Sequence, residues 1–336
     1  MRIAVYKDNL STGRGADRAV RNFAAGLAER GYDVALMEKA EFLETLESGG
    51  RFDVIVATGS NEIVDICEMG YFRRNERARV VLQLHLAPRG FFKWRHPLRN
   101  RRIRAAFDKA DAVQVLCSSY AEEFGKIAPH PPVTVIGNYT DMQAGPVKGG
   151  DPTEGISRTV LYPAAAVNKI KNQRLLIKAF ALLANDFKDW NVRLLGKDTT
   201  PYASRCRRLI DKLGLHGRIE LAGFTDDLAG EYSRAAFVAF PSTLEGFPLA
   251  ILEAAKFSLP VVAQSGLPGI ADIVTAGTGI VTEPDPVAYA EGLLRMMLDE
   301  PARRKLGEAA RIRCEELYAR NKILDQWETF LESVVK

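Results

Sequence analysis

Short apolar runs alternate with stretches of helical periodicity along most of this 336-residue chain. A run of four to six apolar residues between turn residues is typical of a buried strand, and apolar positions spaced three and four apart indicate a helix. In the first half, such runs predict strands at 3–6, 33–37, 53–58, 79–84, 112–116 and 133–136. In the second half they predict strands at 159–162, 192–195, 219–224, 237–240 and from 261 onward. This alternation predicts an α/β fold with parallel sheets covered on both faces.

The segment 144–157 separates the two sets of strands. It consists largely of glycine, proline and charged residues, the composition of a linker or surface loop. A chain of this length suggests two domains of about 150 residues each. We therefore expect two doubly wound, Rossmann-like domains, residues 1–142 and 143–316. Ligands on such sheets bind beyond the carboxyl ends of the strands.

Composition limits the classes of protein. The formal net charge is +4, which does not by itself demand nucleic acid. The four cysteines lie far apart and form no C-x-x-C pair, so they indicate neither a zinc site nor a disulfide framework. The first predicted strand begins at once, with no signal peptide before it, and no apolar run approaches the roughly 18 residues that span a bilayer. We expect a cytoplasmic protein.

Residues 237–262 carry the most informative pattern, which reads as strand, turn, helix and strand. Glu245 lies in the turn and Glu253 on the second turn of the helix. The backbone N–H groups of Gly246, Phe247 and Leu249 lie at the helix start, where donors and a positive dipole end favour a phosphate. The alternative is structural, with Glu245 favouring the helix dipole and Glu253 solvated on the helix surface.

The same string resembles the Glu-x7-Glu signature of the retaining family 4 glycosyltransferases. The matching residues are Pro241-Ser242, Glu245-Gly246-Phe247, Glu253-Ala254 and Pro260-Val261-Val262. The resemblance implies the GT-B architecture, in which two Rossmann-like domains face each other across a cleft. It implies that Glu253 holds the ribose of a nucleotide diphosphate sugar and that Glu245 holds the donor sugar. It also implies that a C-terminal helix, at about 317–336, packs back on the first domain.

Two lysines lie where the first strand of the second domain leads into its helix. Alone, Lys169 and Lys171 would be read as solvent-exposed. The family resemblance implies that Lys171 corresponds to the lysine that neutralises the leaving diphosphate. Ala166 occupies the position of the family's partner arginine, so Lys169 is the candidate substitute, with less bidentate capacity.

Several glycines and one histidine lie on the expected ligand side of the sheets. Gly13 and Gly15 precede a helix, but Arg18 breaks the G-x-G-x-x-G pattern, so a tight turn is the simpler interpretation. The resemblance implies that this turn contacts donor and acceptor, and that His85 approaches the transferred sugar. Gly196, Gly223 and Phe224 follow strands of the second domain and are expected to let a nucleotide approach the backbone.

Twelve basic residues between 73 and 109 are opposed only by Glu76 and Asp108, with Phe91, Phe92, Trp94 and Leu98 interleaved. Basic charge beside exposed aromatics is the composition of a surface that binds anionic lipid headgroups. A solvated helix face with core aromatics explains the pattern equally well. No recognised nucleic-acid motif accompanies the charges, so no nucleic-acid partner is expected. The membrane interpretation places the protein peripherally on the inner face of the cytoplasmic membrane.

The combined expectation is a retaining, metal-independent glycosyltransferase without a cofactor. It would move a hexose-type sugar from a nucleotide diphosphate sugar, UDP favoured and GDP next, to a hydroxyl of a glycan or lipid-linked acceptor in bacterial cell-surface polysaccharide or lipopolysaccharide assembly. The sequence contains no D-x-D or H-E-x-x-H motif and no clustered histidines. Three alternatives stay open: a catalytically impaired nucleotide-sugar binder, a hydrolysing nucleotide-sugar epimerase, and a nicotinamide dehydrogenase that uses Glu38.

Overall fold

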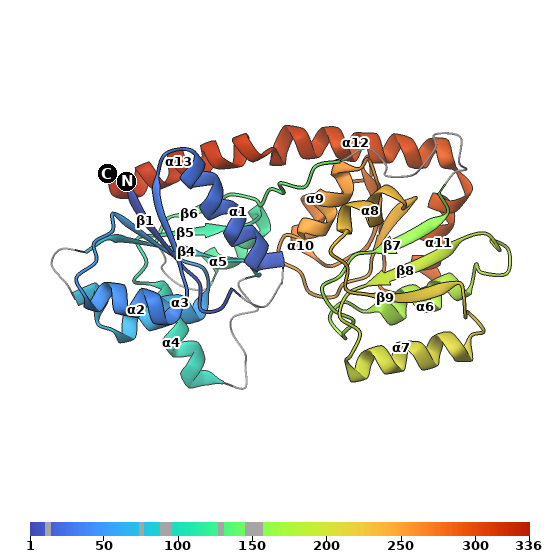
Figure 1. The fold of residues 1–336 in the computed structure, drawn as a ribbon, viewed down its shortest axis with the longest axis horizontal. Helices are drawn as coiled ribbons and strands as arrows, with labels where there is room; N and C mark the ends of the chain where they lie inside the picture. Colours follow the sequence, from blue (N-terminus) through green and yellow to red (C-terminus); the bar gives the residue numbers. More distant parts are fainter. Residues whose placement is uncertain (11–14, 74–76, 88–95, 127–130, 145–156) are drawn as a thin grey trace. The chain divides into compact units, whose positions relative to one another are not determined.

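A computed structural model describes residues 1–10, 15–73, 77–87, 96–126, 131–144 and 157–336 (Figure 1). Its internal contacts divide the chain into two compact units. The first consists of Met1–Thr140 together with Tyr318–Lys336, and the second of Asp141–Leu317. The division expected from the sequence lay at residues 142 and 316. Each unit is an α/β domain built on its own sheet.

The first unit contains one sheet of six parallel strands in the order β2-β1-β3-β4-β5-β6. Helices lie against both faces of this sheet (Figure 1). Along the chain the elements are β1 (Arg2–Tyr6), α1 (Gly15–Glu29), β2 (Asp33–Met37), α2 (Lys39–Glu47), β3 (Val54–Ala57), α3 (Ser60–Glu68), a 3-10 turn (Tyr71–Arg73), β4 (Arg79–Gln83), α4 (Pro97–Phe107), β5 (Ala112–Val115), α5 (Ser118–Gly125) and β6 (Val133–Val135). The strand order reverses between β1 and β3, which is the topological switch point of this unit.

The second unit repeats this plan with six parallel strands in the order β12-β11-β10-β7-β8-β9. Its elements are β7 (Thr159–Tyr162), α6 (Gln173–Ala181), β8 (Asn191–Leu195), α7 (Pro201–Lys212), β9 (Ile219–Gly223), α8 (Leu228–Ser233), β10 (Phe237–Phe240), α9 (Leu249–Lys256), β11 (Val261–Gln264), α10 (Pro268–Ala271), β12 (Gly279–Thr282), α11 (Pro286–Leu298) and α12 (Glu300–Tyr318). The order reverses between β7 and β10. The predicted α/β class with two parallel, doubly wound sheets is confirmed.

The last helix, α13 (Arg320–Val335), completes the core of the first unit. The Trp327 ring lies 4.3 Å from the Phe23 ring of α1. A Cβ at Gly26 would come within 2.8 Å of Leu324, so glycine is what lets α1 and α13 approach. The helix begins later than the predicted residue 317 because the backbone of Ala319 is extended, with ψ 141°, and ends α12. No helix of the described ranges combines the length and the apolar character needed to cross a membrane.

Candidate functional site

The switch point of the second sheet brings two predicted site residues together. Strands β7 and β10 are parallel neighbours, with Val160 opposite Phe237 and Leu161 opposite Val238. The loops that follow them therefore leave from the same edge of the sheet. There the Nζ atom of Lys171 lies 2.5 Å from Oε1 of Glu245, in a partly buried ion pair.

These two loops are fastened to each other by a small network of hydrogen bonds. The Tyr162 hydroxyl donates to the carbonyl oxygen of Lys171 at 2.8 Å and lies 2.7 Å from Oγ of Ser242. The backbone N–H and the hydroxyl of Thr243 both donate to the carbonyl oxygen of Ile170, at 2.7 and 3.0 Å. Burial raises the pKa of Tyr162 well above its usual range, so its hydroxyl keeps the proton that it donates. The backbone on both sides of the ion pair is thus held in place.

Glu253 is a buried residue and not a solvated one. It lies on α9, only 1% of it is exposed, and its Oε2 accepts a hydrogen bond from the Tyr232 hydroxyl at 3.0 Å. Pro248 precedes the helix and provides no side-chain cap. The first N–H groups of a helix have no partner within it, so those at the start of α9 are suited to an anion. Gly246, Phe247 and Leu249 are buried beside this helix start.

The glycine after β8 has a packing role that the sequence did not reveal. Gly196 has φ +114°, and a Cβ there would lie 2.3 Å from the carbonyl oxygen of Ala164. Only glycine fits, because the loops after β7 and β8 pack backbone to backbone. Gly223 also has a positive φ, of +73°, and its carbonyl oxygen accepts a hydrogen bond from the Gly196 N–H. Phe224, the next residue, is 74% exposed at the end of β9.

A lysine that the sequence analysis missed lies beside Ala166. Lys197 forms a parallel bridge with Ala166: its N–H donates to Ala165, and its carbonyl oxygen accepts from Val167, both at 3.0 Å. Its side chain is exposed. Lys169, the substitute proposed from the sequence, is exposed as well. The sequence does contain a signal that could have identified Lys197: it directly follows the glycine at the end of a predicted strand.

In the first unit, Gly15 begins α1, whereas Gly13 lies outside the described residues. His85 follows β4, and both of its ring nitrogens are buried without a hydrogen-bond partner in the part of the chain that the structure describes. Burial, reinforced by the positive charge of Lys7, lowers the pKa of His85 to about 3, although Asp17 acts in the opposite direction. The imidazole is therefore neutral at physiological pH and able to donate one hydrogen bond.

The acidic residue that a dinucleotide site would need is already engaged. Glu38 follows β2, and its Oε1 accepts a hydrogen bond from the backbone N–H of Leu10 at 2.6 Å. Together with Arg18 in the helix-opening turn, this disfavours the dehydrogenase alternative. Within the described ranges, no group of three or more His, Cys, Asp or Glu side chains is placed to hold a metal ion.

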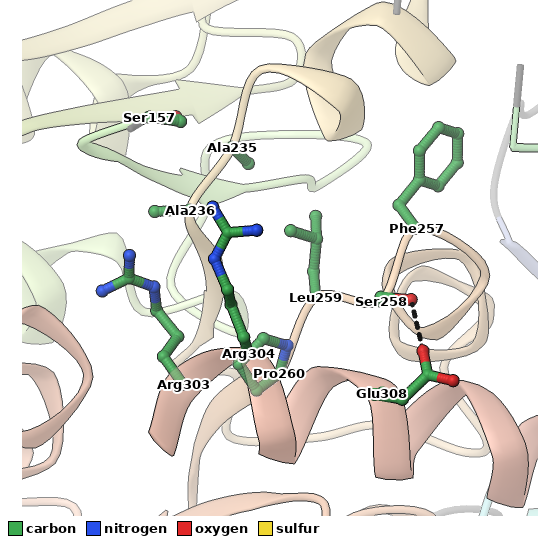
Figure 2. A pocket seen from close by; sticks show the side chains of 10 residues that line it. All are labelled: Ser157, Ala235, Ala236, Phe257, Ser258, Leu259, Pro260, Arg303, Arg304 and Glu308. Carbon is green, nitrogen blue, oxygen red and sulfur yellow. Dashed lines mark hydrogen bonds between the residues drawn. The ribbon is translucent and has the colours of Figure 1, made fainter. Parts of the chain in front are cut away.

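A separate pocket of about 390 Å³ lies at the amino ends of strands in the second unit (Figure 2). It is lined by Ser157, Ala235, Ala236, Phe257, Ser258, Leu259, Pro260, Arg303, Arg304 and Glu308. The buried Arg303 donates to the carbonyl oxygen of Met296 at 2.7 Å and lies over the Trp190 ring. That arginine thus links the end of α11 to α12. The lining includes none of the site residues predicted from the sequence.

Comparison with known proteins gives the family. Residues 153–313 match the family described as "Glycosyl transferases group 1". By this match, residues 153–313 are similar to the group 1 glycosyl transferases. The resemblance to glycosyltransferases that was drawn from Pro241 to Val262 is confirmed.

The relatives that match this chain differ in how much of their own length it spans. An exopolysaccharide phosphotransferase of Streptomyces coelicolor is 36% identical over 181 residues, which are 53% of this chain but 19% of that protein. An N-acetyl-alpha-D-glucosaminyl L-malate synthase of Bacillus anthracis is 24% identical over 71% of this chain and 64% of its own. The chain thus spans less than two thirds of either relative.

A solved structure extends the likeness to the whole fold. The Anabaena protein HepE in complex with UDP is 18% identical, with a TM-score of 0.82 over 99% of this chain and 100% of its own. At this identity the likeness concerns the fold alone. It confirms the GT-B fold class that the resemblance implied.

The buried ring nitrogens of His85 predict a specific pH dependence of stability. Its folded pKa lies below the value of about 6.5 expected for the unfolded chain, so only the unfolded state takes up the proton between these values. Stability should fall as pH is lowered through this window, by at most about 1.4 kcal/mol per pH unit. His85→Leu removes this proton, so the difference in free energy of unfolding between wild type and variant should shrink by about 2 kcal/mol from about pH 7 to about pH 5.

Urea denaturation followed by circular dichroism measures this difference. His216→Leu is the control, because the His216 side chain is 75% exposed. A wild type and a His85→Leu variant with the same pH dependence would show that His85 does not titrate as its burial requires.

Proposed function

We propose that this chain is a retaining glycosyltransferase that moves a hexose-type sugar from a nucleotide diphosphate sugar to an acceptor hydroxyl. The observation that carries the proposal is the Lys171–Glu245 pair beside the start of α9, at the switch point of the domain that matches the family. UDP is the favoured nucleotide, because the HepE structure of the same fold contains it. GDP is the next candidate.

The site supplies the interactions that such a donor requires. Lys171 and the first N–H groups of α9 place positive charge where a diphosphate would leave, which stabilises the charge that develops on it. This arrangement does not require a metal ion. In this proposal, Glu253 on α9 accepts hydrogen bonds from the ribose, and Glu245 accepts them from the donor sugar.

The family resemblance suggests the course of the reaction. The bond between the anomeric carbon and the phosphate oxygen breaks, through a transition state that resembles an oxocarbenium ion. The acceptor oxygen bonds to the same face of that carbon, so the configuration is retained. The acceptor proton passes to an oxygen of the leaving phosphate, and Lys171 balances the charge of the diphosphate as it departs.

Ala166 favours a second candidate, a catalytically impaired protein that binds the nucleotide sugar without transferring it. An arginine at that position would supply a second positive charge, and alanine supplies none. We propose that Lys197 compensates, because its backbone is bonded to that of the loop that contains Ala166. A lysine is a single flexible point charge, so the compensation would be partial compared with an arginine.

The compensation predicts different effects for the two exposed lysines. Lys197→Ala should weaken binding of the nucleoside diphosphate about tenfold, since a charge-assisted contact contributes about 1.5 kcal/mol. Lys169→Ala should leave affinity within about twofold if Lys197 is the compensating residue. Isothermal titration calorimetry of both variants decides between them, and a loss on Lys169→Ala alone would support the substitute inferred from the sequence.

Removing either member of the central pair should abolish sugar transfer. Glu245→Ala deletes the contact to the donor sugar, and Lys171→Ala the charge opposite the diphosphate, so each should lower kcat by at least about a hundredfold. Glu291→Ala, an exposed glutamate on α11, is the control and should leave kcat unchanged. Release of nucleoside diphosphate in the presence of acceptor is the assay. Turnover retained in both variants would refute the assigned roles.

The acceptor is proposed to be a glycan or lipid-linked hydroxyl, reached while the protein lies on an anionic membrane surface. Helix α4 buries Ile103, Ala106 and Phe107 and exposes Leu98, which is 78% accessible. Four arginines are exposed on the same helix: Arg99, Arg101, Arg102 and Arg104. Elsewhere in the basic segment, Arg77 and Arg79 pair with Asp111. Its aromatic residues Phe91, Phe92 and Trp94 lie outside the described residues.

Sedimentation with anionic vesicles tests this surface. Replacing the four α4 arginines by serine should lower vesicle binding at least tenfold, because each basic residue near such a surface contributes about 1 kcal/mol. Serine at Arg205, Arg207, Arg208 and Lys212 of α7 removes the same formal charge and should have a much smaller effect. Equal losses in the two variants would show that net charge alone drives the binding.

A further inference from the structure

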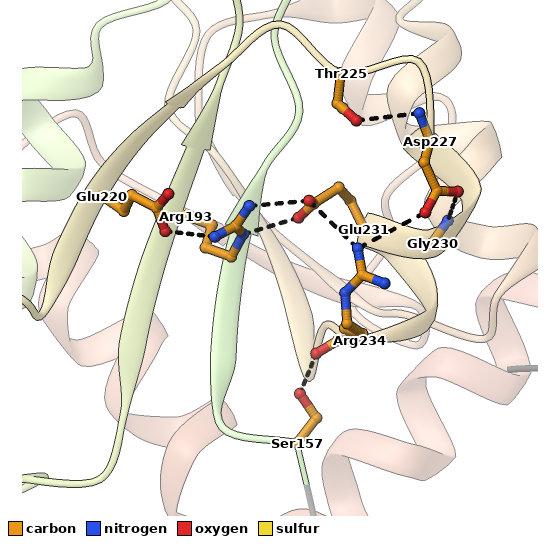
Figure 3. Close-up of polar contacts among 8 residues, drawn as sticks. All are labelled: Ser157, Arg193, Glu220, Thr225, Asp227, Gly230, Glu231 and Arg234. Carbon is orange, nitrogen blue, oxygen red and sulfur yellow. Dashed lines mark hydrogen bonds and ion pairs between the residues drawn. The ribbon is translucent and has the colours of Figure 1, made fainter. Parts of the chain in front are cut away.

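A bidentate ion pair fastens the short helix α8 to the second sheet (Figure 3). From the middle of β8, Nε and Nη2 of Arg193 each lie 2.9 Å from one carboxylate oxygen of Glu231. Nη1 of the same arginine donates to Glu220 on β9. The Glu231 side chain is only 7% exposed. A bidentate pair fixes direction as well as distance, so it sets where α8 lies on the sheet.

This helix depends on such external support. α8 contains six residues, and a helix this short is not stable by itself. At its start, Asp227 accepts a hydrogen bond from the Gly230 N–H at 2.9 Å. Towards its end, Nη2 of Arg234 lies 3.4 Å from Glu231. Charge pairs and the cap at its start therefore help to hold α8, and the residue next to Glu231, in position.

That next residue is Tyr232, which connects α8 to α9. Its hydroxyl lies 3.0 Å from Oε2 of Glu253 and 3.1 Å from the carbonyl oxygen of Ala250. Its ring stacks on Phe257 at the end of α9, with ring centres 5.4 Å apart. The Tyr232 side chain is fully buried. A phenol has one proton to donate, and Oε2 of Glu253 is one of the two acceptors within its reach.

We propose that Tyr232 is a positioning residue for Glu253, and that the Arg193–Glu231 pair keeps Tyr232 in register with it. A carboxylate as buried as Glu253 is costly unless it is hydrogen-bonded, and the Tyr232 hydroxyl supplies one such bond and fixes the direction of the carboxyl group. A Glu253 held in this orientation can accept hydrogen bonds from both ribose hydroxyls. This inference rests on the proposed function, in which Glu253 holds the ribose.

A positioning role for Tyr232 has a measurable consequence that a purely structural role lacks. If Tyr232 acts through Glu253, its hydroxyl matters only for ligands that carry ribose hydroxyls. A matched control exists in the same unit. Tyr289 is also fully buried, and its hydroxyl donates to the carbonyl oxygen of Val262 at 2.8 Å. Tyr289→Phe and Tyr232→Phe thus each remove one buried hydroxyl and keep the ring.

The test measures calorimetric affinities of the full chain for UDP, GDP and ADP, and then for the 2′,3′-dideoxy form of the diphosphate that binds best. Tyr232→Phe should weaken the parent diphosphate about fivefold to tenfold, the effect of one hydrogen bond, and leave the dideoxy form unchanged. Tyr289→Phe should change neither affinity. Glu231→Gln should show the pattern of Tyr232→Phe to a smaller extent, and it provides a second variant if Tyr232→Phe fails to fold.

Two results would overturn the inference in different ways. If Tyr232→Phe weakens both ligands equally, or neither, Tyr232 does not act through Glu253, and the proposed function is unaffected. If the wild type binds none of the three diphosphates, the proposed function fails and the role of Tyr232 fails with it. Thermal melting of each variant separates lost affinity from lost fold.

Discussion

The candidate site depends on one topological constraint, the adjacency of the parallel strands β7 and β10 at the switch point of the second sheet. Parallel neighbours end at the same edge, so the loops after them must meet there. The chain uses this meeting to place a lysine against a glutamate at the start of a helix. Side chains 74 positions apart in the sequence thus become one charged group.

Two buried tyrosines support the groups that would contact a ligand. Tyr162 holds the backbone of Lys171 and contacts Ser242 on the neighbouring loop. Tyr232 contacts Glu253 and stacks on the end of α9. In both cases an apolar ring is packed in the core while its hydroxyl reaches a polar residue, which combines burial with a fixed direction. The site is thereby preorganised by the core itself.

The sequence predicted the sheets well because strands buried on both faces read as continuous apolar runs. It missed β12, where only Ile280 and Val281 are apolar, and it began the last helix before the extended residue Ala319. It brought Lys171 and Glu245 to one site only through the family resemblance, because the residues alone left Lys171 as a solvent-exposed lysine. Their ion pair, however, depends on rotamers that no sequence pattern encodes.

For the same reason, the sequence could not predict which polar side chains are buried or which residues they contact. Nothing in its spacing distinguishes Glu253, which is buried, from a solvated helix glutamate. The roles of Arg193 and Tyr232 arise from packing between α8, α9 and β8, and the bridge between Lys197 and Ala166 from contact between loops. The identity of the sugar, the acceptor and the nucleotide is set by contacts that the pattern of elements does not specify.

Hydrogen–deuterium exchange of the full chain, with and without each of UDP, GDP and ADP, tests the central claim most directly. Binding at the switch point predicts that one diphosphate slows exchange in residues 163–172 and 241–253, because these loops and the start of α9 would contact it. If no diphosphate slows exchange there, or if protection appears instead around the pocket at 257–260 and 303–308, the account of the site is contradicted.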